Sequence, residues 1–252
     1  MSMHLVKYSA SGNDFVIFHT FTKKDRSELA KRLCHRQEGI GADGLIVLVP
    51  HSELDFEWQF YNADGSEAAM CGNGSRAAAH YAYSYGLAPA KMQFLTLAGV
   101  IEASVEGDIV ESQLTEHKIL QKDIEEFGRS WWLIDTGVPH LVTFVEDLKH
   151  FNKDEAKTLR NKYNANVNYA IIRSPNEIGV RTFERGVEDE TLACGTGMAA
   201  CFVRALEEKR VQSQSKLYPK SGEELSIRYN DKRLYFKGRV KKIFVTHKEE
   251  SA

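Results

Sequence analysis

Much of the chain consists of short segments in which apolar and polar residues alternate with the two-residue period of a β-strand. Residues 56–60 alternate in this way, whereas residues 45–49 form a continuous apolar run. Polar turns, often with glycine, separate these segments. We predict further strands at residues 5–8, 15–19, 92–96, 100–105, 109–113, 131–135, 140–145, 169–173, 180–184, near Leu217, and at residues 225–229, 234–237 and 240–245.

A smaller set of segments has helical spacing. Residues 25–34 carry leucines four positions apart with charged residues between them, and residues 153–160 are a second candidate. Two longer helices are predicted at residues 71–85 and 194–209. The first turns of residues 71–85 are small or aromatic on every side, which is expected of a helix wrapped by a sheet.

One stretch of the chain occurs twice in outline. Cys71 is followed by two glycines and a run of small residues, and so is Cys194, which lies 123 residues later (194 − 71). The similarity extends upstream, where residues 60–67 match 183–190, residues 42–47 match 167–172, and residues 11–13 match 136–138. A period of roughly 110 to 120 residues is the size of a domain, so we interpret the chain as a duplicated half.

The repeat and the element pattern predict an α+β fold of two pseudo-symmetric lobes, each a curled mixed β-sheet around a central helix. The polar stretch at residues 115–129 is the best candidate for the boundary. We therefore expect an N-terminal lobe at residues 1–116, carrying the Cys71 helix, and a C-terminal lobe at residues 117–242, carrying the Cys194 helix. Active sites favour the cleft between two such lobes.

Composition narrows the function classes. The 252 residues carry a formal charge of −2, with 42% hydrophobic and 27% charged residues, which gives no electrostatic reason to expect a nucleic-acid partner. No window is long and apolar enough to cross a bilayer and no secretory signal is evident, so we expect a cytoplasmic protein without a membrane partner. The four cysteines lack the spacing of metal ligands, so we expect free thiols and no metal.

Cys71 and Cys194 each stand where a loop turns into a predicted helix. Helix N-termini leave amide groups unpaired and carry a partial positive charge, so they bind anions and lower the pKa of cysteine. Two such ends facing each other would hold one carboxylate between two activated thiols. This arrangement suits the interconversion of enantiomers at an amino-acid α-carbon, because a base and an acid must act there on opposite faces.

In this hypothesis one cysteine is a thiolate base and the other a protonated acid, and they exchange roles with the direction of the reaction. The helix-end amides would bind the α-carboxylate and stabilise the charge that develops on it, as an oxyanion hole does. These amides belong to Gly72, Asn73, Gly195 and Thr196. No phosphate-cradling loop tied to a lysine is evident, so we expect no pyridoxal cofactor.

Six motifs in order resemble the diaminopimelate epimerase family of cofactor-independent, two-cysteine racemases. They occupy residues 11–15, 39–43, 62–67, 71–74, 184–186 and 194–197. The ordered set covers nearly the whole chain and is far more specific than any single motif. The resemblance implies interconversion of LL- and meso-diaminopimelate, a step toward bacterial lysine and peptidoglycan, with Cys71 and Cys194 as acid and base. Family members are commonly homodimers, and their final strand, here residues 243–252, returns to the first lobe.

The resemblance also implies the contacts with the substrate. Asn13 and Glu184 would orient the reacting amino group, while Asn62, Asn168 and Arg185 would hold the distal amino-acid end. An arginine suits the last role because its planar fork binds a carboxylate with two parallel hydrogen bonds.

Two positions depart from the family pattern, and both concern substrate binding. Val138 stands where the family has asparagine, and Gly44 stands where it has glutamine. A racemase for another amino acid is therefore an alternative within the same fold. Two alternatives belong to other classes: a redox protein in which Cys71 and Cys194 form a reversible disulfide, and a binding module for amino acids.

The remaining candidate residues favour structural roles. Cys34 and Cys201 lie in apolar helical stripes and are expected to be buried. Glu67 and Glu190 each stand four residues before a cysteine and are expected to cap the following helix. His140 follows a proline at the edge of the site and is expected to support the site rather than transfer a proton directly.

Overall fold

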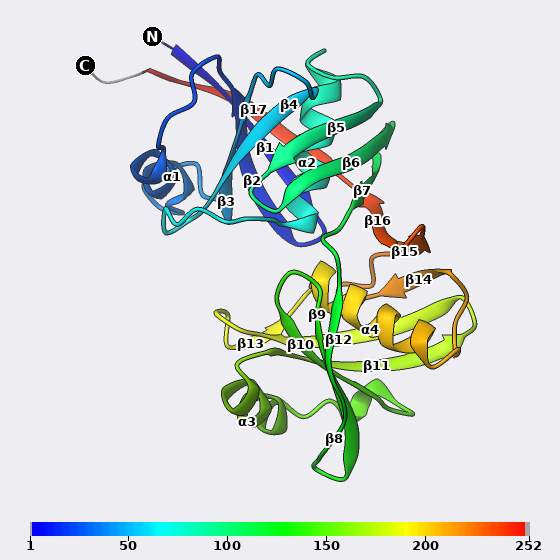
Figure 1. The fold of residues 1–252 in the computed structure, drawn as a ribbon. Helices are drawn as coiled ribbons and strands as arrows, with labels where there is room; N and C mark the ends of the chain where they lie inside the picture. Colours follow the sequence, from blue (N-terminus) through cyan, green and yellow to red (C-terminus); the bar gives the residue numbers. More distant parts are fainter. Residues whose placement is uncertain (1, 250–252) are drawn as a thin grey trace. The chain divides into compact units, whose positions relative to one another are not determined.

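The computed structural model describes residues 2–249, and its internal contacts divide the chain into two compact units (Figure 1). The first unit runs to Gln113 and resumes at Gly238, and the second unit is Leu114–Lys237. None of the helices among residues 2–249 is long and apolar enough to span a membrane.

The first unit is one mixed sheet with two helices. Its elements are β1 (Ser2–Ala10), β2 (Asn13–His19), α1 (Ser27–Cys34), β3 (Gly44–Val49), β4 (Phe56–Asn62), α2 (Gly72–Ser84), β5 (Lys91–Thr96), β6 (Gly99–Glu106), β7 (Ile109–Gln113) and β17 (Lys241–Glu249). The strands follow the order β17, β1, β2, β3, β4, β5, β6, β7. The pairs β2–β3 and β4–β5 are parallel, and the others are antiparallel.

Helix α2 is the centre of the first unit. It packs against β1, β2 and β3 and also against β6 and β7, so the sheet curls around it. Every residue from Gly72 to Ala79 is buried, which confirms the prediction of a helix wrapped by a sheet. Helix α1 covers the other face of β3 and β4, and β3 is therefore buried along its whole length. Its continuous apolar run is the sequence signature of a strand covered on both faces.

The second unit repeats this architecture. Its elements are β8 (Lys118–Glu126), β9 (Arg129–Asp135), β10 (Pro139–Phe144), η1 (Leu148–His150), α3 (Lys153–Tyr163), β11 (Asn166–Ser174), β12 (Glu177–Glu184), β13 (Asp189–Thr191), α4 (Gly195–Glu207), β14 (Gln214–Tyr218), β15 (Leu225–Asn230) and β16 (Arg233–Arg239). The strands follow the order β8, β9, β10, β11, β12, β14, β15, β16, and β13 pairs at the side with β12.

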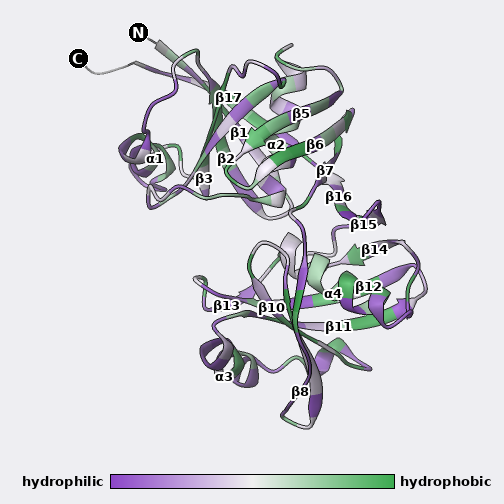
Figure 2. Ribbon diagram, in the orientation of Figure 1, coloured by the Kyte–Doolittle hydropathy of each residue, from purple (hydrophilic) through white to green (hydrophobic). Residues whose placement is uncertain are grey.

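The two units agree in topology strand by strand. In each, the third and fourth strands of the order are parallel, as are the fifth and sixth, and all other neighbours are antiparallel. Each unit has an outer helix, α1 or α3, and an inner helix, α2 or α4. Figure 2 shows mainly hydrophilic colours on the outer pair, in keeping with a single apolar face. The α+β fold of two pseudo-symmetric lobes, each with a sheet around a central helix, is thus confirmed.

One difference from the sequence interpretation is the strand β8. Residues 118–126, predicted to be part of a polar boundary, form the strand β8 at the edge of the second sheet. Most of its side chains are exposed on both faces, so it lacks the alternation by which strands are recognised. The equivalent strand of the first unit, β17, comes from the other end of the chain and pairs with β1, which confirms the expected return of the final strand to the first lobe.

Candidate active site

Cys71 is the N-cap residue of α2. Its extended backbone ends the preceding loop, and its Sγ accepts a hydrogen bond of 3.4 Å from the Gly74 N–H. The thiol is partly exposed, whereas Gly72 and Asn73 behind it are buried. The first amides of a helix have no acceptor within the helix, so those of Gly72 and Asn73 form a donor pair beside the sulfur.

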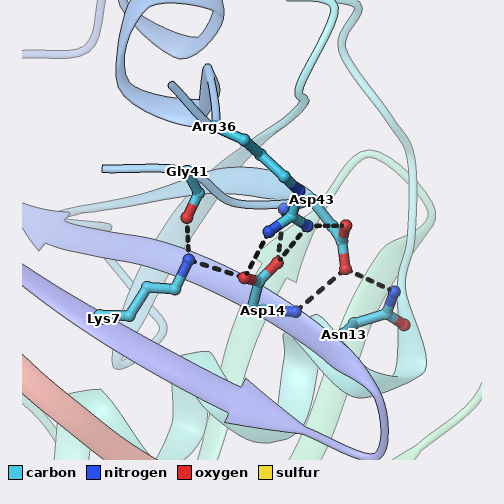
Figure 3. Close-up of polar contacts among 6 residues, drawn as sticks. All are labelled: Lys7, Asn13, Asp14, Arg36, Gly41 and Asp43. Atoms are coloured by element: carbon cyan, nitrogen blue, oxygen red, sulfur yellow. Dashed lines mark hydrogen bonds and ion pairs between the residues drawn. The ribbon is translucent and has the colours of Figure 1, made fainter. Parts of the chain in front are cut away.

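Asn13 lies at the start of β2, next to this helix end. Its Oδ1 accepts a hydrogen bond of 2.8 Å from Asn73 Nδ2. Its own Nδ2 donates to Asp43 Oδ2 at 3.0 Å, as Figure 3 shows. Asn13 is therefore joined to the Cys71 helix through Asn73. Asn62 lies further away in the sequence, at the exposed end of β4, and its Nδ2 donates to Ser66 Oγ at 3.0 Å.

The departure from the family pattern at Gly44 has a local cause. A Cβ atom on Gly44 would lie 2.6 Å from Cε2 of Phe60 and 2.9 Å from the carbonyl oxygen of Tyr61. The Phe60 ring packs against Phe15 in the core around α2. Any side chain at position 44 would therefore have to displace the Phe60 ring.

Cys194 is the N-cap residue of α4 and occupies the position of Cys71 in the second unit. It is 7% exposed, and its Sγ lies 3.5 Å from Thr196 Oγ1. The Thr196 carbonyl accepts a hydrogen bond of 2.8 Å from Thr136 Oγ1, which ties the helix start to the turn before β10. The turn that contains Val138 thus lies beside this half of the site.

His140 connects the core of the second unit to Cys194. Its Nε2 lies 2.9 Å from Thr196 Oγ1, and its Nδ1 lies 3.1 Å from Asn168 Nδ2. The histidine is completely buried, and burial together with the positive charge of Arg185 lowers the pKa of His140 to about 3. His140 is therefore neutral near pH 7 and carries a proton on only one of its two nitrogens.

The orientation of the Asn168 amide indicates which nitrogen of His140 carries this proton. Asn168 Nδ2 donates to the Leu141 carbonyl at 3.0 Å, and its Oδ1 accepts from Thr182 Oγ1 at 2.8 Å. With the amide fixed in this orientation, Asn168 donates to His140 Nδ1 at 3.1 Å. This contact is shorter than the 3.4 Å between Asn166 Nδ2 and His140 Nε2, so we assign the hydrogen to Nε2. Nε2 then donates to Thr196, whose hydroxyl hydrogen is left for the Cys194 sulfur.

These contacts engage every polar atom of Asn168, which is 0% exposed. Its role in holding the distal end of a substrate is therefore not supported by its surroundings. Asn166 precedes it by two positions on β11, on the same face of the strand. The Oδ1 of Asn166 accepts from the Arg185 N–H at 2.7 Å, and its Nδ2 approaches His140 Nε2 at 3.4 Å. The sequence interpretation missed Asn166, although strand alternation pairs it with Asn168.

Glu184 and Arg185 follow at the end of β12, where Glu184 pairs with Asp189 of β13. Both side chains are half-buried. The Arg185 guanidinium donates to the Asn164 carbonyl at 3.1 Å and lies close enough to His140 to lower its pKa. Arg185 is thus placed beside the core of the Cys194 half-site.

The expected capping role of the two upstream glutamates is wrong. Glu190 lies in β13, where it forms a two-pronged ion pair with Arg181 and a further contact with Lys220. The backbone of Glu67 forms an isolated antiparallel β-bridge with that of Tyr61. The N-cap residue of each helix is the cysteine itself and not the glutamate four positions before it.

The other two thiols match the expectation of burial. Cys34 is 2% exposed and Cys201 is 0% exposed, and burial raises the pKa of both, that of Cys34 to about 12. Both thiols therefore stay protonated near pH 7 and cannot act as a base there. No group of three histidine, cysteine, aspartate or glutamate side chains within residues 2–249 is arranged to hold a metal ion.

The architecture is shared with a class of solved proteins. The chain superposes with a TM-score of 0.77 on a phenazine biosynthesis protein of the PhzF family from Enterococcus faecalis, over 99% of this chain and 100% of that one, at 13% identity. A probable proline racemase from Agrobacterium radiobacter K84 gives a TM-score of 0.75 at 14% identity, over 99% and 93% of the two chains. The fold is therefore that of the two-lobed PhzF and proline racemase class.

Within this class, the sequence identifies the family. The family model described as "Diaminopimelate epimerase" matches residues 5–119 and 132–243. A diaminopimelate epimerase from a Nitratiruptor species is 76% identical over 98% of this chain and 99% of its own length. One from Campylobacter jejuni (strain RM1221) is 56% identical over 96% of this chain and 97% of its own. The chain belongs to the diaminopimelate epimerase family.

Proposed function

We propose that this protein interconverts LL- and meso-diaminopimelate without a cofactor, using Cys71 and Cys194 as an acid/base pair. The observation that carries the proposal is the equivalent placement of the two cysteines, each as the N-cap of the inner helix of its unit. The relatives at 76% and 56% identity, both named diaminopimelate epimerase, supply the substrate.

In the proposed reaction the thiolate of one cysteine removes the α-hydrogen as a proton, and the electron pair of the C–H bond moves into the carboxylate as an enediolate. The thiol of the other cysteine delivers its proton to the opposite face of the α-carbon. The amides of Gly72, Asn73, Gly195 and Thr196 bind the carboxylate on which charge develops. Each such donor is typically worth about 3 kcal/mol in the transition state.

The surroundings of both sulfurs support a reversible reaction. The Cys71 sulfur accepts from the Gly74 N–H, and the Cys194 sulfur faces the Thr196 hydroxyl at the end of the hydrogen-bond chain from Asn168 and His140. A donor aimed at sulfur stabilises the thiolate over the thiol. Either cysteine can therefore hold the negative charge, and the two can exchange roles with the direction of the reaction.

For the substrate we propose that Asn13 and Glu184 orient the reacting amino group, while Asn62 and Arg185 hold the distal end. We assign Asn168 to the support of His140, because its polar atoms are already bonded within the second unit. A racemase for another amino acid is the second candidate. It is favoured by Val138 and by the Phe60 ring beside Gly44, which replace polar side chains of the family pattern with apolar surroundings.

The proposal is tested by turnover and by hydrogen exchange. Purified enzyme should interconvert LL- and meso-diaminopimelate and introduce solvent deuterium at the α-carbon, with no turnover of proline, histidine or glutamate. Cys71→Ala and Cys194→Ala should each abolish epimerisation, whereas Cys34→Ala, in a buried thiol, should retain it. Turnover of another amino acid but not of diaminopimelate would favour the second candidate, and full activity of either active-site variant would remove that thiol from the mechanism.

We further propose that the protein acts in the cytoplasm as a homodimer. The thiol mechanism needs reduced Cys71 and Cys194, and none of the four cysteines, all within the described residues, forms a disulfide. Among residues 2–249, β17 pairs only with β1, so its second edge is open. Three successive residues of this strand, Ile243, Phe244 and Val245, are 43–52% exposed. An open apolar edge strand can be covered by the same strand of a second copy.

A further inference from the structure

In the first unit, the side-chain amides of Asn13 and Asn73 form a row of hydrogen bonds with a carboxylate at one end and a guanidinium at the other. Asp43 Oδ2 accepts from Asn13 Nδ2 at 3.0 Å, and Asn13 Oδ1 accepts from Asn73 Nδ2 at 2.8 Å. At the other end, Asn73 Oδ1 accepts from Nη2 of the fully buried Arg76 at 2.6 Å. A carboxylate can only accept and a guanidinium can only donate, so this order of charges permits one orientation of both amides.

Asp43 has several hydrogen-bond partners of its own (Figure 3). Its Oδ1 accepts from Arg36 Nη2 at 2.8 Å, and its Oδ2 also accepts from the Asp14 N–H at 3.1 Å. The Asp43 N–H returns a bond of 2.8 Å to Asp14 Oδ1. Arg36 also donates hydrogen bonds to both carboxylate oxygens of Asp14, so one guanidinium bridges two neighbouring carboxylates.

Lys7 completes this group as a second positive charge. Its ammonium lies 2.8 Å from Asp14 Oδ2 and also donates to the Gly41 carbonyl, in the loop that leads to Asp43. Burial alone would raise the pKa of Asp14, but the hydrogen bonds from Arg36 and Lys7 outweigh it and lower the pKa to about 2. The two carboxylates and two cations thus form a neutral cluster that fixes Asp43 against β2.

We propose that Asp43 is a positioning residue for the reaction: it turns the Asn13 side chain so that the carbonyl oxygen, and not the NH₂ group, is available to the ammonium group of the substrate. The inference rests on the proposed epimerisation and on the role of Asn13 at the reacting amino group. An ammonium group has only hydrogen-bond donors, so it needs an acceptor. Asn13 Oδ1 uses one lone pair for Asn73 and keeps a second for the substrate.

Asp43→Asn tests the proposal because it conflicts with both neighbours. With its new oxygen paired to Arg36, asparagine at position 43 would point NH₂ at the NH₂ group of Asn13. If Asn13 rotated in response, its NH₂ would meet that of Asn73, which Arg76 holds in place. We expect kcat/KM for LL-diaminopimelate to fall by about tenfold to a hundredfold, the effect of losing a hydrogen bond to a charged group. Glu38→Gln, which neutralises an exposed carboxylate in the same loop, is the matched control and should retain wild-type kinetics.

The decisive variant exchanges the two groups, as N13D/D43N. The amide now at position 43 can donate to the carboxylate now at position 13, which accepts from Asn73 and still faces the ammonium group. The bond from the Asp14 N–H is lost equally in D43N and in N13D/D43N, so it cancels from the comparison. We expect the double variant to exceed D43N in kcat/KM by at least about tenfold.

Thermal unfolding of each variant separates folding from positioning. If D43N alone fails to fold, N13D/D43N is compared with the wild type, since it keeps the net charge and the amide–carboxylate pair. A folded double variant without activity would then overturn the inference. A folded double variant no more active than D43N, or D43N with wild-type kinetics, would overturn the inference while wild-type epimerisation left the proposed function intact. A wild-type enzyme that does not epimerise diaminopimelate would instead count against the proposed function.

Discussion

Asn168 illustrates at the scale of single residues how hydrogen-bond partners decide a role. The family resemblance predicts a substrate contact for Asn168, but its amide forms hydrogen bonds with His140, Leu141 and Thr182. An amide that is completely buried, with both donors engaged and its oxygen already accepting a bond, orients its neighbours and is shielded from a ligand. The neutral state of His140 is a consequence of the same surroundings.

His140 therefore predicts how stability changes with pH. The pKa of His140 is lowered from 6.5 to about 3. At a pH between these two values, His140 is therefore protonated in the unfolded chain but neutral in the folded chain. The stabilisation is fully present above pH 6.5 and is lost as the pH falls toward 3. We expect the free energy of unfolding to fall by about 2 to 3 kcal/mol between about pH 7 and about pH 4.5 from this residue.

Urea unfolding followed by the fluorescence of Trp131 and Trp132, which lie in the same unit, measures this change. His140→Gln should be less stable near neutral pH but should show a flatter profile between about pH 6.5 and about pH 4.5. Asp14 does not interfere, because its lowered pKa removes stability only as the pH falls from 3.8 to about 2. Parallel profiles for the two proteins would contradict a neutral, buried His140.

At the scale of elements, the inner helices α2 and α4 start alike but are packed differently. Both begin with a cysteine as N-cap and have a glycine three residues later. A Cβ atom on Gly74 would lie 3.3 Å from Cys71 Cβ and from Ile46 Cδ1. A Cβ atom on Gly197 would lie only 2.3 Å from Asn168 Oδ1. The close packing of α4 on β11 therefore requires glycine at this position.

This difference predicts unequal effects of the same substitution in the two units. Gly197→Ala should displace Asn168, break its bonds to His140 and Thr182, and cost about 2 to 4 kcal/mol of stability together with most of the activity. Gly74→Ala should change stability by about 1 kcal/mol or less, since the tight contacts are offset by the better helix propensity of alanine. Chemical denaturation of both variants makes the comparison, and equal losses would refute it.

At the scale of the whole molecule, the duplication explains the strand order of each unit. Both sheets have the same sequence of parallel and antiparallel neighbours, but the outermost strand is β8 in one and β17 in the other. The chain thus returns to its first unit with its last strand. That strand lies at a sheet edge and exposes apolar side chains, which links the topology to the proposed dimer.

The dimer is tested by sedimentation velocity. Wild-type protein should sediment as a dimer, and Phe244→Lys, which places a charge in the middle of the exposed segment of β17, should shift it to the monomer. Leu97→Lys is the matched control, because Leu97 is 62% exposed in the same unit but lies at the turn between β5 and β6. A monomeric wild-type protein, or a dimer unaffected by Phe244→Lys, would exclude β17 as the contact.

The sequence by itself determined the duplicated α+β fold, the inner helices and the cysteines at their starts, because these features are local. Apolar periodicity, glycine spacing and the order of motifs are all carried by neighbouring residues. Only the tertiary structure decided that Asn168 contacts His140, that Glu190 pairs with Arg181 and Lys220, and that Asp43 lies against Asn13. Each of these depends on partners between 9 and 30 positions away in the chain, and a hydrogen bond is made or lost over a few tenths of an ångström.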